Sequence, residues 1–166
     1  MKIKTIQVGD LDTNCYIVTK DKECLIIDPG DDFNKIQKEI RNNKVVGCLV
    51  THFHQDHIEA LEEVVSFYEV EINKESFGSF KYEIIETPGH TFDSKTFYFA
   101  EDKIMFTGDF IFNSGLGRTD LGGNDKDMIS SIKEFMKYDD NITLYPGHGP
   151  STTLGQEKNN LLNYYK

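Results

Sequence analysis

Three imidazoles and a carboxylate lie within the six positions of residues 52–57, directly after an apolar run. His52 and His54 are two residues apart on an extended or turning backbone, so their side chains can chelate one ion. Asp56 and His57 could reach a second ion from a strand-to-helix turn. Imidazole and carboxylate ligands suit zinc, iron or manganese, and no cysteine is near enough to indicate a thiolate-rich structural zinc site. The pattern therefore predicts a metal site.

The other two of the five histidines, His90 and His148, each follow a glycine, and Asp109 follows Gly108. Taken singly, each of these residues is more typical of a turn than of a ligand. Glycine favours a bent backbone that could bring a side chain close to a crowded centre. Together with residues 52–57 they suggest a third ligand for each of two ions and a carboxylate that bridges them.

Two cations a few ångströms apart would hold a bridging water and lower its pKa toward neutrality. The resulting hydroxide could attack an ester, thioester, lactone or phosphoester whose oxygen is polarised by one metal. Asp56 is the candidate group that orients the water and accepts its proton. Such a site hydrolyses its substrate without a serine or cysteine nucleophile.

Alternating and apolar runs predict the strands that must position these ligands, and helical periodicity predicts four helices. Four of the strands lead into His52, His90, Asp109 and His148, and strand ends can converge on a common edge. The expected strands are residues 2–8, 14–19, 24–27, 45–50, 70–72, 80–85, 96–100, 103–106 and 142–144. The expected helices are 33–42, capped by Asp31 or Asp32, then 58–67, 126–137, capped by Asp125, and 154–165; residues 110–123 are expected to form a loop.

Composition limits the function classes that remain. A length of 166 residues suits one domain, and 38% hydrophobic and 28% charged residues are typical of a globular protein. The net charge of −10 argues against non-specific nucleic-acid binding. Neither a membrane-spanning run nor a signal peptide is evident, so we expect a cytoplasmic protein that does not bind membranes. The three cysteines are expected to be buried, reduced thiols.

The motifs resemble those of the metallo-β-lactamase superfamily, in the same order along the chain. They are T-H-F-H-Q-D-H at 51–57, T-P-G-H-T at 87–91, T-G-D at 107–109 and Y-P-G-H-G at 145–149, with T-N-C-Y at 13–16 and I-D-P-G at 27–30. Within that superfamily, the G-R-T-D segment at 117–120 looks most like glyoxalase II-type (hydroxyacylglutathione) hydrolases and their short bacterial relatives. The resemblance covers residues 5–157.

This resemblance implies an α/β fold, a four-layer αββα sandwich formed by one domain over residues 1–166. It implies two divalent ions, zinc first and iron or manganese as alternatives, with Asp109 bridging them. It places Asp28 behind the site, where a turn carboxylate is an equally good interpretation. The ligands that it implies are His52, His54 and His90 for the first ion, and Asp56, His57 and His148 for the second.

The chain departs from the family pattern in places that bear on its substrate. Glu59 stands where glycine is usual, and residues 92–94 replace a Pro-Gly-Ser segment. The interval from His57 to His90 is short, so a more open cleft is expected. We also expect the C-terminal helical domain of full glyoxalase II enzymes, and with it that part of their thioester site, to be absent. Arg118 could bind a substrate carboxylate, although an ion pair with Asp120 that braces the loop is the slightly favoured alternative.

Three functions remain after this reasoning. The leading hypothesis is a binuclear hydrolase acting on a small thioester or ester such as an S-acylglutathione. A mononuclear iron persulfide dioxygenase shares the histidine cluster and the G-R-T-D loop, and a non-catalytic metal-storing or metal-sensing module is the third possibility. Metal stoichiometry distinguishes the first two. The sequence leaves the acyl group, the native metal and the oligomeric state open.

Overall fold

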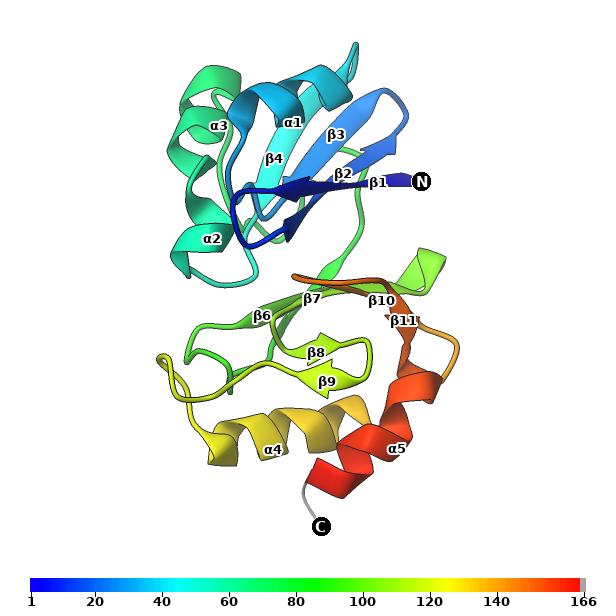
Figure 1. Cartoon of the computed structure of the whole chain (residues 1–166). Helices are drawn as coiled ribbons and strands as arrows, with labels where there is room; N and C mark the ends of the chain where they lie inside the picture. The colour runs from blue at the N-terminus through cyan, green and yellow to red at the C-terminus, as the bar shows by residue number, and fades with distance from the viewer. Residues whose placement is uncertain (165–166) are drawn as a thin grey trace. The chain divides into compact units, whose positions relative to one another are not determined.

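The computed structural model describes residues 1–164, and the chain divides into two compact units, Met1–Tyr82 and Glu83–Lys166. Each unit has its own sheet and its own helices (Figure 1). Among residues 1–164, no helix is both long and apolar enough to span a membrane.

The first unit is built on a four-stranded sheet in the order β1-β2-β3-β4. The first three strands pair antiparallel in succession, while β4 lies parallel to β3. This parallel pairing requires a crossover, which α1 supplies. The elements are β1 (Lys2–Val8), β2 (Thr13–Lys20), β3 (Glu23–Ile27), α1 (Phe33–Ile40), β4 (Lys44–Leu49), α2 (Gln55–Ile58) and α3 (Leu61–Tyr68).

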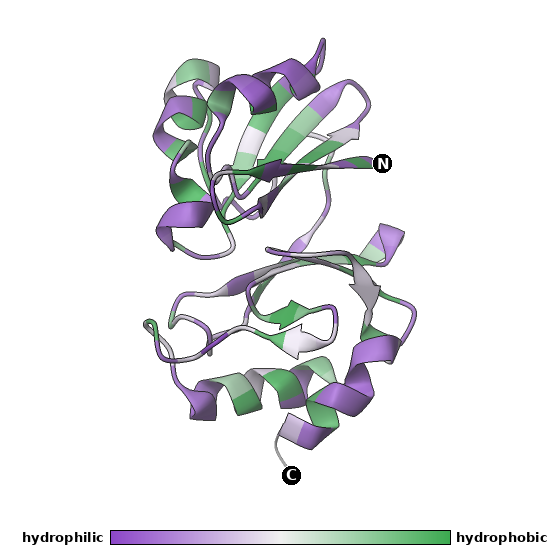
Figure 2. Ribbon diagram, in the orientation of Figure 1, coloured by the Kyte–Doolittle hydropathy of each residue, from purple (hydrophilic) through white to green (hydrophobic). Residues whose placement is uncertain are grey.

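The core of the first unit lies between this sheet and its helices. Ile36 and Ile40, four residues apart on α1, are buried against strand residues such as Ile26, and Val64 of α3 joins the same cluster. Figure 2 shows α1 as mostly hydrophilic outside this stripe, while the strands that it covers are mainly hydrophobic. The three cysteines lie on neighbouring strands of the same sheet, all free and buried, as expected.

The second unit is built on a five-stranded sheet in the order β11-β10-β7-β6-β5 and carries a separate β8–β9 hairpin. Strands β5, β6 and β7 pair antiparallel in succession, and β10 lies parallel to β7. The elements are β5 (Glu83–Glu86), β6 (Lys95–Phe99), η1 (Ala100–Asp102), β7 (Ile104–Gly108), β8 (Ile111–Phe112), β9 (Gly115–Leu116), α4 (Asp125–Phe135), β10 (Thr143–Pro146), β11 (Thr152–Thr153) and α5 (Leu154–Tyr164).

Helices α4 and α5 supply the apolar side chains that close the core of the second unit. Phe135 of α4 meets Phe110 edge-to-face at 4.8 Å between ring centroids, and both rings are buried. Leu161 of α5 belongs to the same cluster as Met105 of β7. The side chain of Asn124 caps α4 by accepting the amide of Asp127 at 2.8 Å.

Several predicted elements need correction. The helix expected over 58–67 begins at Leu61 as α3, and a separate short helix, α2, ends at Ile58. Residues 70–72 form a single bridge, Ile72 with Cys48, and the strand expected from residue 80 begins at Glu83. Helix α4 is capped by Asn124 rather than Asp125, and Asp32 precedes α1 without a side-chain capping bond. The loop expected over 110–123 contains β8 and β9. The last helix matches to Tyr164, and its expected end at residue 165 lies outside the described residues.

Candidate metal centre

In the first unit, the chain segments that follow β3 and β4 lie at the same edge of the sheet, because the two strands are parallel. Asp28 directly follows β3, and its amide donates to the carbonyl of Leu49, the last residue of β4, at 3.0 Å. The stretch 51–57 begins two residues further on. The strand order therefore brings Asp28 beside the histidine cluster, although 23 residues separate it from Thr51.

The four candidate ligands of this unit face one another. The ring centroids of His52 lie 4.8 Å from those of His54 and 4.1 Å from those of His57. Oδ2 of Asp56 lies 3.4 Å from Nε2 of His57. His52 and His57 are buried, while His54 and Asp56 are partly exposed. The local arrangement places two imidazoles beneath the surface and two ligands at its rim.

A buried carboxylate holds the inner two histidines from behind. Asp28 is 1% exposed; its Oδ1 accepts the amide of Thr51 at 2.7 Å, and its Oδ2 accepts the hydroxyl of Thr51 at 2.6 Å. The same Oδ2 lies 2.9 Å from Nδ1 of His57. An ionised carboxylate can only accept, so Nδ1 of His57 carries the proton and Nε2 carries the lone pair that binds metals.

Asp56 is held by Thr13, a buried residue at the start of β2. The hydroxyl of Thr13 donates to Oδ2 of Asp56 at 2.9 Å. The side chain of Asp56 is 24% exposed, so this carboxylate is anchored on one oxygen and still reaches the surface. Neither Thr13 nor Thr51 was singled out by the sequence reasoning, although both lie in the motifs that carry the family resemblance; a hydroxyl next to a ligand motif is the signal that could have identified them.

In the second unit, three strands run in the same direction and end at the same edge. Strand β10 is parallel to β7, and β5 is antiparallel to β6, which is antiparallel to β7. Their carboxyl ends lead into His148, Asp109 and His90 respectively. The prediction that strand ends gather these ligands is confirmed within this unit by the distances. Nε2 of His90 and Nε2 of His148 each lie 3.5 Å from Oδ2 of Asp109.

These 3.5 Å separations exceed the usual 2.7–3.2 Å of an N–H···O hydrogen bond and suit groups that converge on a common point. Asp109 lies between the two imidazoles in this unit, the position that a bridging ligand requires. Its side chain is 11% exposed, that of His90 is 5% exposed, and that of His148 is 29% exposed. This set therefore runs from the interior to the surface.

The backbone of the loop after β9 orients His90. Nδ1 of His90 lies 2.6 Å from the carbonyl oxygen of Arg118, which can only accept, so Nδ1 carries the proton. Gly117 allows this approach, because a Cβ there would lie 1.8 Å from the carbonyl oxygen of Asp109 and 3.0 Å from Nδ1 of His90. A glycine at 117 is therefore required by close packing against two candidate ligands.

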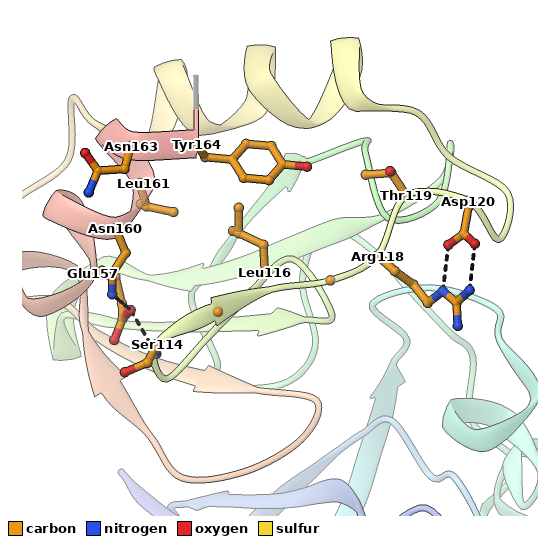
Figure 3. Close-up of a pocket in the computed structure, with 12 residues that line it drawn as sticks. Ser114, Leu116, Arg118, Thr119, Asp120, Glu157, Asn160, Leu161, Asn163 and Tyr164 are labelled. Atoms are coloured by element: carbon orange, nitrogen blue, oxygen red, sulfur yellow. Dashed lines mark hydrogen bonds and ion pairs between the residues drawn. The ribbon is translucent and has the colours of Figure 1, made fainter. Parts of the chain in front are cut away.

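The Arg118 side chain forms a two-point ion pair with Asp120. Nε and Nη2 of Arg118 each donate to one carboxylate oxygen of Asp120 at 2.6 Å (Figure 3). The guanidinium holds the pKa of Asp120 at about 2, and both side chains are more than 60% exposed. This is the geometry expected of a loop brace.

The same loop lines a cavity of about 540 Å³ on the α5 side of the second unit (Figure 3). Leu116 and Leu161 supply its apolar wall. Glu157 is buried beside it and accepts bonds from the amide of Ser114 at 3.0 Å and the hydroxyl of Thr152 at 2.6 Å. These bonds satisfy the carboxylate as a structural support of the loop.

A family model described as the metallo-beta-lactamase superfamily matches residues 8–72 and 68–148. This chain belongs to the metallo-beta-lactamase superfamily. The probable metallo-hydrolase YqgX of Bacillus subtilis (strain 168) is 30% identical over 207 aligned positions, covering 98% of both proteins. The hydroxyacylglutathione hydrolase GloC of Haemophilus influenzae is 32% identical and covers 95% of both. In structure, the BLEG-1 B3 metallo-beta-lactamase matches with a TM-score of 0.90 and 27% identity, covering 95% of this chain and 97% of that one.

These likenesses confirm the predicted family and its α/β metallo-β-lactamase fold. They also support a metal-dependent enzyme, since YqgX and GloC are both named as hydrolases. The alignment with YqgX spans 207 positions against the 166 residues of this chain, so this metallo-β-lactamase domain has shorter segments than that relative.

Proposed function

We propose that this chain is a hydrolase that holds two divalent ions, zinc first, and cleaves a small thioester of the S-acylglutathione class. The superfamily supports metal-dependent hydrolysis, and the name of GloC supports the thioester. The net charge of −10 is consistent with a site that takes up divalent cations rather than nucleic acid.

The observation that carries the proposal is the way in which the protein fixes its imidazoles. Nδ1 of His57 faces the Asp28 carboxylate at 2.9 Å, and Nδ1 of His90 faces the Arg118 carbonyl at 2.6 Å. Acceptors at Nδ1 select the tautomer whose Nε2 binds metal and raise its basicity. A turn histidine does not require such a buried acceptor. The donor chemistry of both units therefore fits transition-metal or zinc ions.

The proposed ligand assignment divides each unit's set between two ions. In this proposal His52, His54 and His90 would hold the first ion, and Asp109 would be shared with the second. The second ion takes Asp56, His57 and His148. Distances within each unit support the pairs His52–His54, Asp56–His57, His90–Asp109 and His148–Asp109.

When bound, the two ions would supply the Lewis acidity that lowers the pKa of a water toward neutrality. Asp56 is then the proposed proton acceptor. The hydroxyl of Thr13 anchors Oδ2 of this carboxylate at 2.9 Å. Its 24% exposure keeps it within reach of a substrate that enters from solvent. Asp28, at 1% exposure, acts behind the site and orients His57 and Thr51.

The proposed substrate is a small molecule, and Arg118, whose side chain is 63% exposed, is the candidate partner of a carboxylate on it. Glutathione thioesters carry such carboxylates. In the present structure Asp120 occupies the fork of that guanidinium, so a carboxylate substrate would have to displace it. Arg118 is therefore proposed as a substrate contact only in a state in which Asp120 has been displaced.

The deciding experiment is metal analysis of the purified protein combined with a panel of S-acylglutathiones, lactones and phosphodiesters. We expect about two ions per chain and thioester hydrolysis, and we expect Asp56→Ala to abolish turnover while the circular dichroism spectrum is unchanged. Fully metallated protein that cleaves no S-acylglutathione excludes the thioester. One iron per chain with oxygen uptake on a persulfide indicates the dioxygenase, and metal binding without any turnover indicates a storage or sensing module.

A further inference from the structure

We propose that the hydroxyl of Thr51 is a positioning group for His52. Through it, one buried carboxylate, Asp28, fixes the tautomer and orientation of two histidines, His52 and His57. The inference rests on the proposed function in one respect, since it takes His52 and His57 as metal ligands. It goes beyond that function by assigning a role to Thr51 and by linking the two metal positions through the protein.

The hydrogen bonds around Thr51 determine their own direction. A hydroxyl carries one proton, and that of Thr51 donates it to Oδ2 of Asp28 at 2.6 Å. Its oxygen lies 3.1 Å from Nδ1 of His52. With its proton committed to the carboxylate, the oxygen can only accept from His52. Nδ1 of His52 therefore carries its proton, and Nε2 is the ligand nitrogen.

Asp28 is well suited to hold this arrangement. It receives the amide of Thr51 at 2.7 Å, the hydroxyl of Thr51 at 2.6 Å and Nδ1 of His57 at 2.9 Å. All of these residues are at most 2% exposed, so water does not compete for the bonds. His57 thus depends on Asp28 directly, and His52 depends on it through Thr51.

The proposed assignment gives this link a consequence, because His52 belongs to the first ion and His57 to the second. Removing the Thr51 hydroxyl should loosen the first site alone. Altering Asp28 should loosen both sites. A merely structural threonine would change the stability of the fold and leave the ratio of the two affinities unchanged.

The test measures Zn²⁺ affinity by competition with a chromogenic chelator, without any substrate. We expect Thr51→Val to weaken one of two sites by about 10- to 100-fold and leave the other unchanged. Thr51→Ser keeps the hydroxyl and should restore the wild-type affinities, and Asp28→Asn should weaken both sites. Thr96→Val is the matched control, since Thr96 is equally buried and its hydroxyl pairs with that of Thr87 at 3.2 Å.

A second readout needs no variant of Thr51. In ¹⁵N spectra of the metal-free wild type, with His52 identified through His52→Asn, we expect the Nδ1–H tautomer of His52. An Nε2–H tautomer overturns the inference, even if Thr51→Val fails to fold. Two intact Zn²⁺ sites in folded Thr51→Val, or equal weakening of both, also overturn it. A wild type that binds fewer than two Zn²⁺ contradicts the proposed function instead.

Discussion

Gly117 packs directly on the backbone of Asp109, so closely that a Cβ on residue 117 would lie 1.8 Å from the Asp109 carbonyl oxygen. The adjacent carbonyl of Arg118 accepts Nδ1 of His90 at 2.6 Å. One short segment, Gly117 and Arg118, therefore positions a candidate bridging carboxylate and a candidate ligand histidine, and it does so through its backbone alone.

Gly117→Ala should displace this segment, because the contact is with backbone that cannot rotate away. We expect a loss of about 1–3 kcal/mol in the free energy of unfolding and a lower zinc affinity, measured by urea titration and chelator competition. Gly115→Ala is the matched control two residues earlier, where a Cβ meets nothing within 4 Å. Equal effects of the two variants would show that close packing at residue 117 is unimportant.

Asp109→Asn should reduce the metal content of the protein. Oδ2 of Asp109 lies 3.5 Å from Nε2 of both His90 and His148, and an amide is a much weaker bridge than a carboxylate. Mass spectrometric metal analysis should fall from about two ions per chain to about one or fewer. Asp102→Asn, an exposed carboxylate in the η1 turn, should leave the content unchanged. Full occupancy in Asp109→Asn would remove this residue from the ligand set.

Arg118→Ala and Asp120→Ala distinguish a loop brace from a substrate contact. If the pair braces the loop that presents the Arg118 carbonyl to His90, both variants should lower zinc affinity to the same extent. If Arg118 binds a substrate carboxylate, only Arg118→Ala should raise KM for S-acylglutathiones, with kcat unchanged. We expect the first result, given the two 2.6 Å bonds to Asp120. Lys137→Ala, which removes another exposed ion pair in this unit, is the control.

The buried cysteines should make the protein sensitive to alkali. Burial raises the pKa of Cys24 to about 12 and raises the pKa values of Cys15 and Cys48 well above the usual range of a thiol. Thiols of the unfolded chain ionise near pH 9 while those of the folded protein remain neutral, so deprotonation favours unfolding. Stability should be unaffected by these groups below about pH 9 and should fall as the pH rises toward 12.

Urea titrations at several pH values test this expectation, and Cys24→Ala is the comparison variant. It should lose less stability between neutral and alkaline pH than the wild type does. The same burial predicts that iodoacetamide labels the native protein at pH 8 much more slowly than the urea-unfolded chain. Rapid labelling of native protein, or identical pH profiles for both proteins, would contradict the account.

Strands and helix starts could be predicted from the sequence where the local pattern and the tertiary structure agree. Strand β1 matches its expected bounds, Lys2–Val8, and α1 begins at the expected Phe33. Apolar periodicity reports burial on one face, which is what these elements require. The gathering of His90, Asp109 and His148 at one edge could be predicted because each follows the end of a predicted strand.

The break between α2 and α3 could not be predicted from periodicity. The amide of Glu59 donates to the carbonyl of Gly30 at 3.1 Å, and that of Ala60 donates to Pro29 at 3.0 Å. These bonds to a distant loop replace the helical bonds of one turn. A contact between segments 29 residues apart, Gly30 and Glu59, leaves no periodic signal in either.

Asn73 illustrates the same limit in the sheet. Residues 70–72 were expected to form a strand, but one bridge at Ile72 is all that the described structure shows there. The side chain of Asn73 instead bonds both backbone groups of Val50, accepting its amide at 2.7 Å and donating to its carbonyl at 3.1 Å. An asparagine side chain that takes the place of a strand partner cannot be recognised from the sequence, because asparagine is not a residue that favours strands.

The two ligand sets differ in how they arise along the chain. His52 to His57 are neighbours in the polypeptide itself, so an unfolded or nascent chain already holds chelating imidazoles. His90, Asp109 and His148 become neighbours only after β5, β7 and β10 have paired. Metal present during refolding can therefore bind residues 52–57 before His90, Asp109 and His148 have come together. A metal that also binds the unfolded chain stabilises the native state less. Metal should therefore be added after the protein has refolded, and the yield of active protein should depend on whether metal is added before or after refolding.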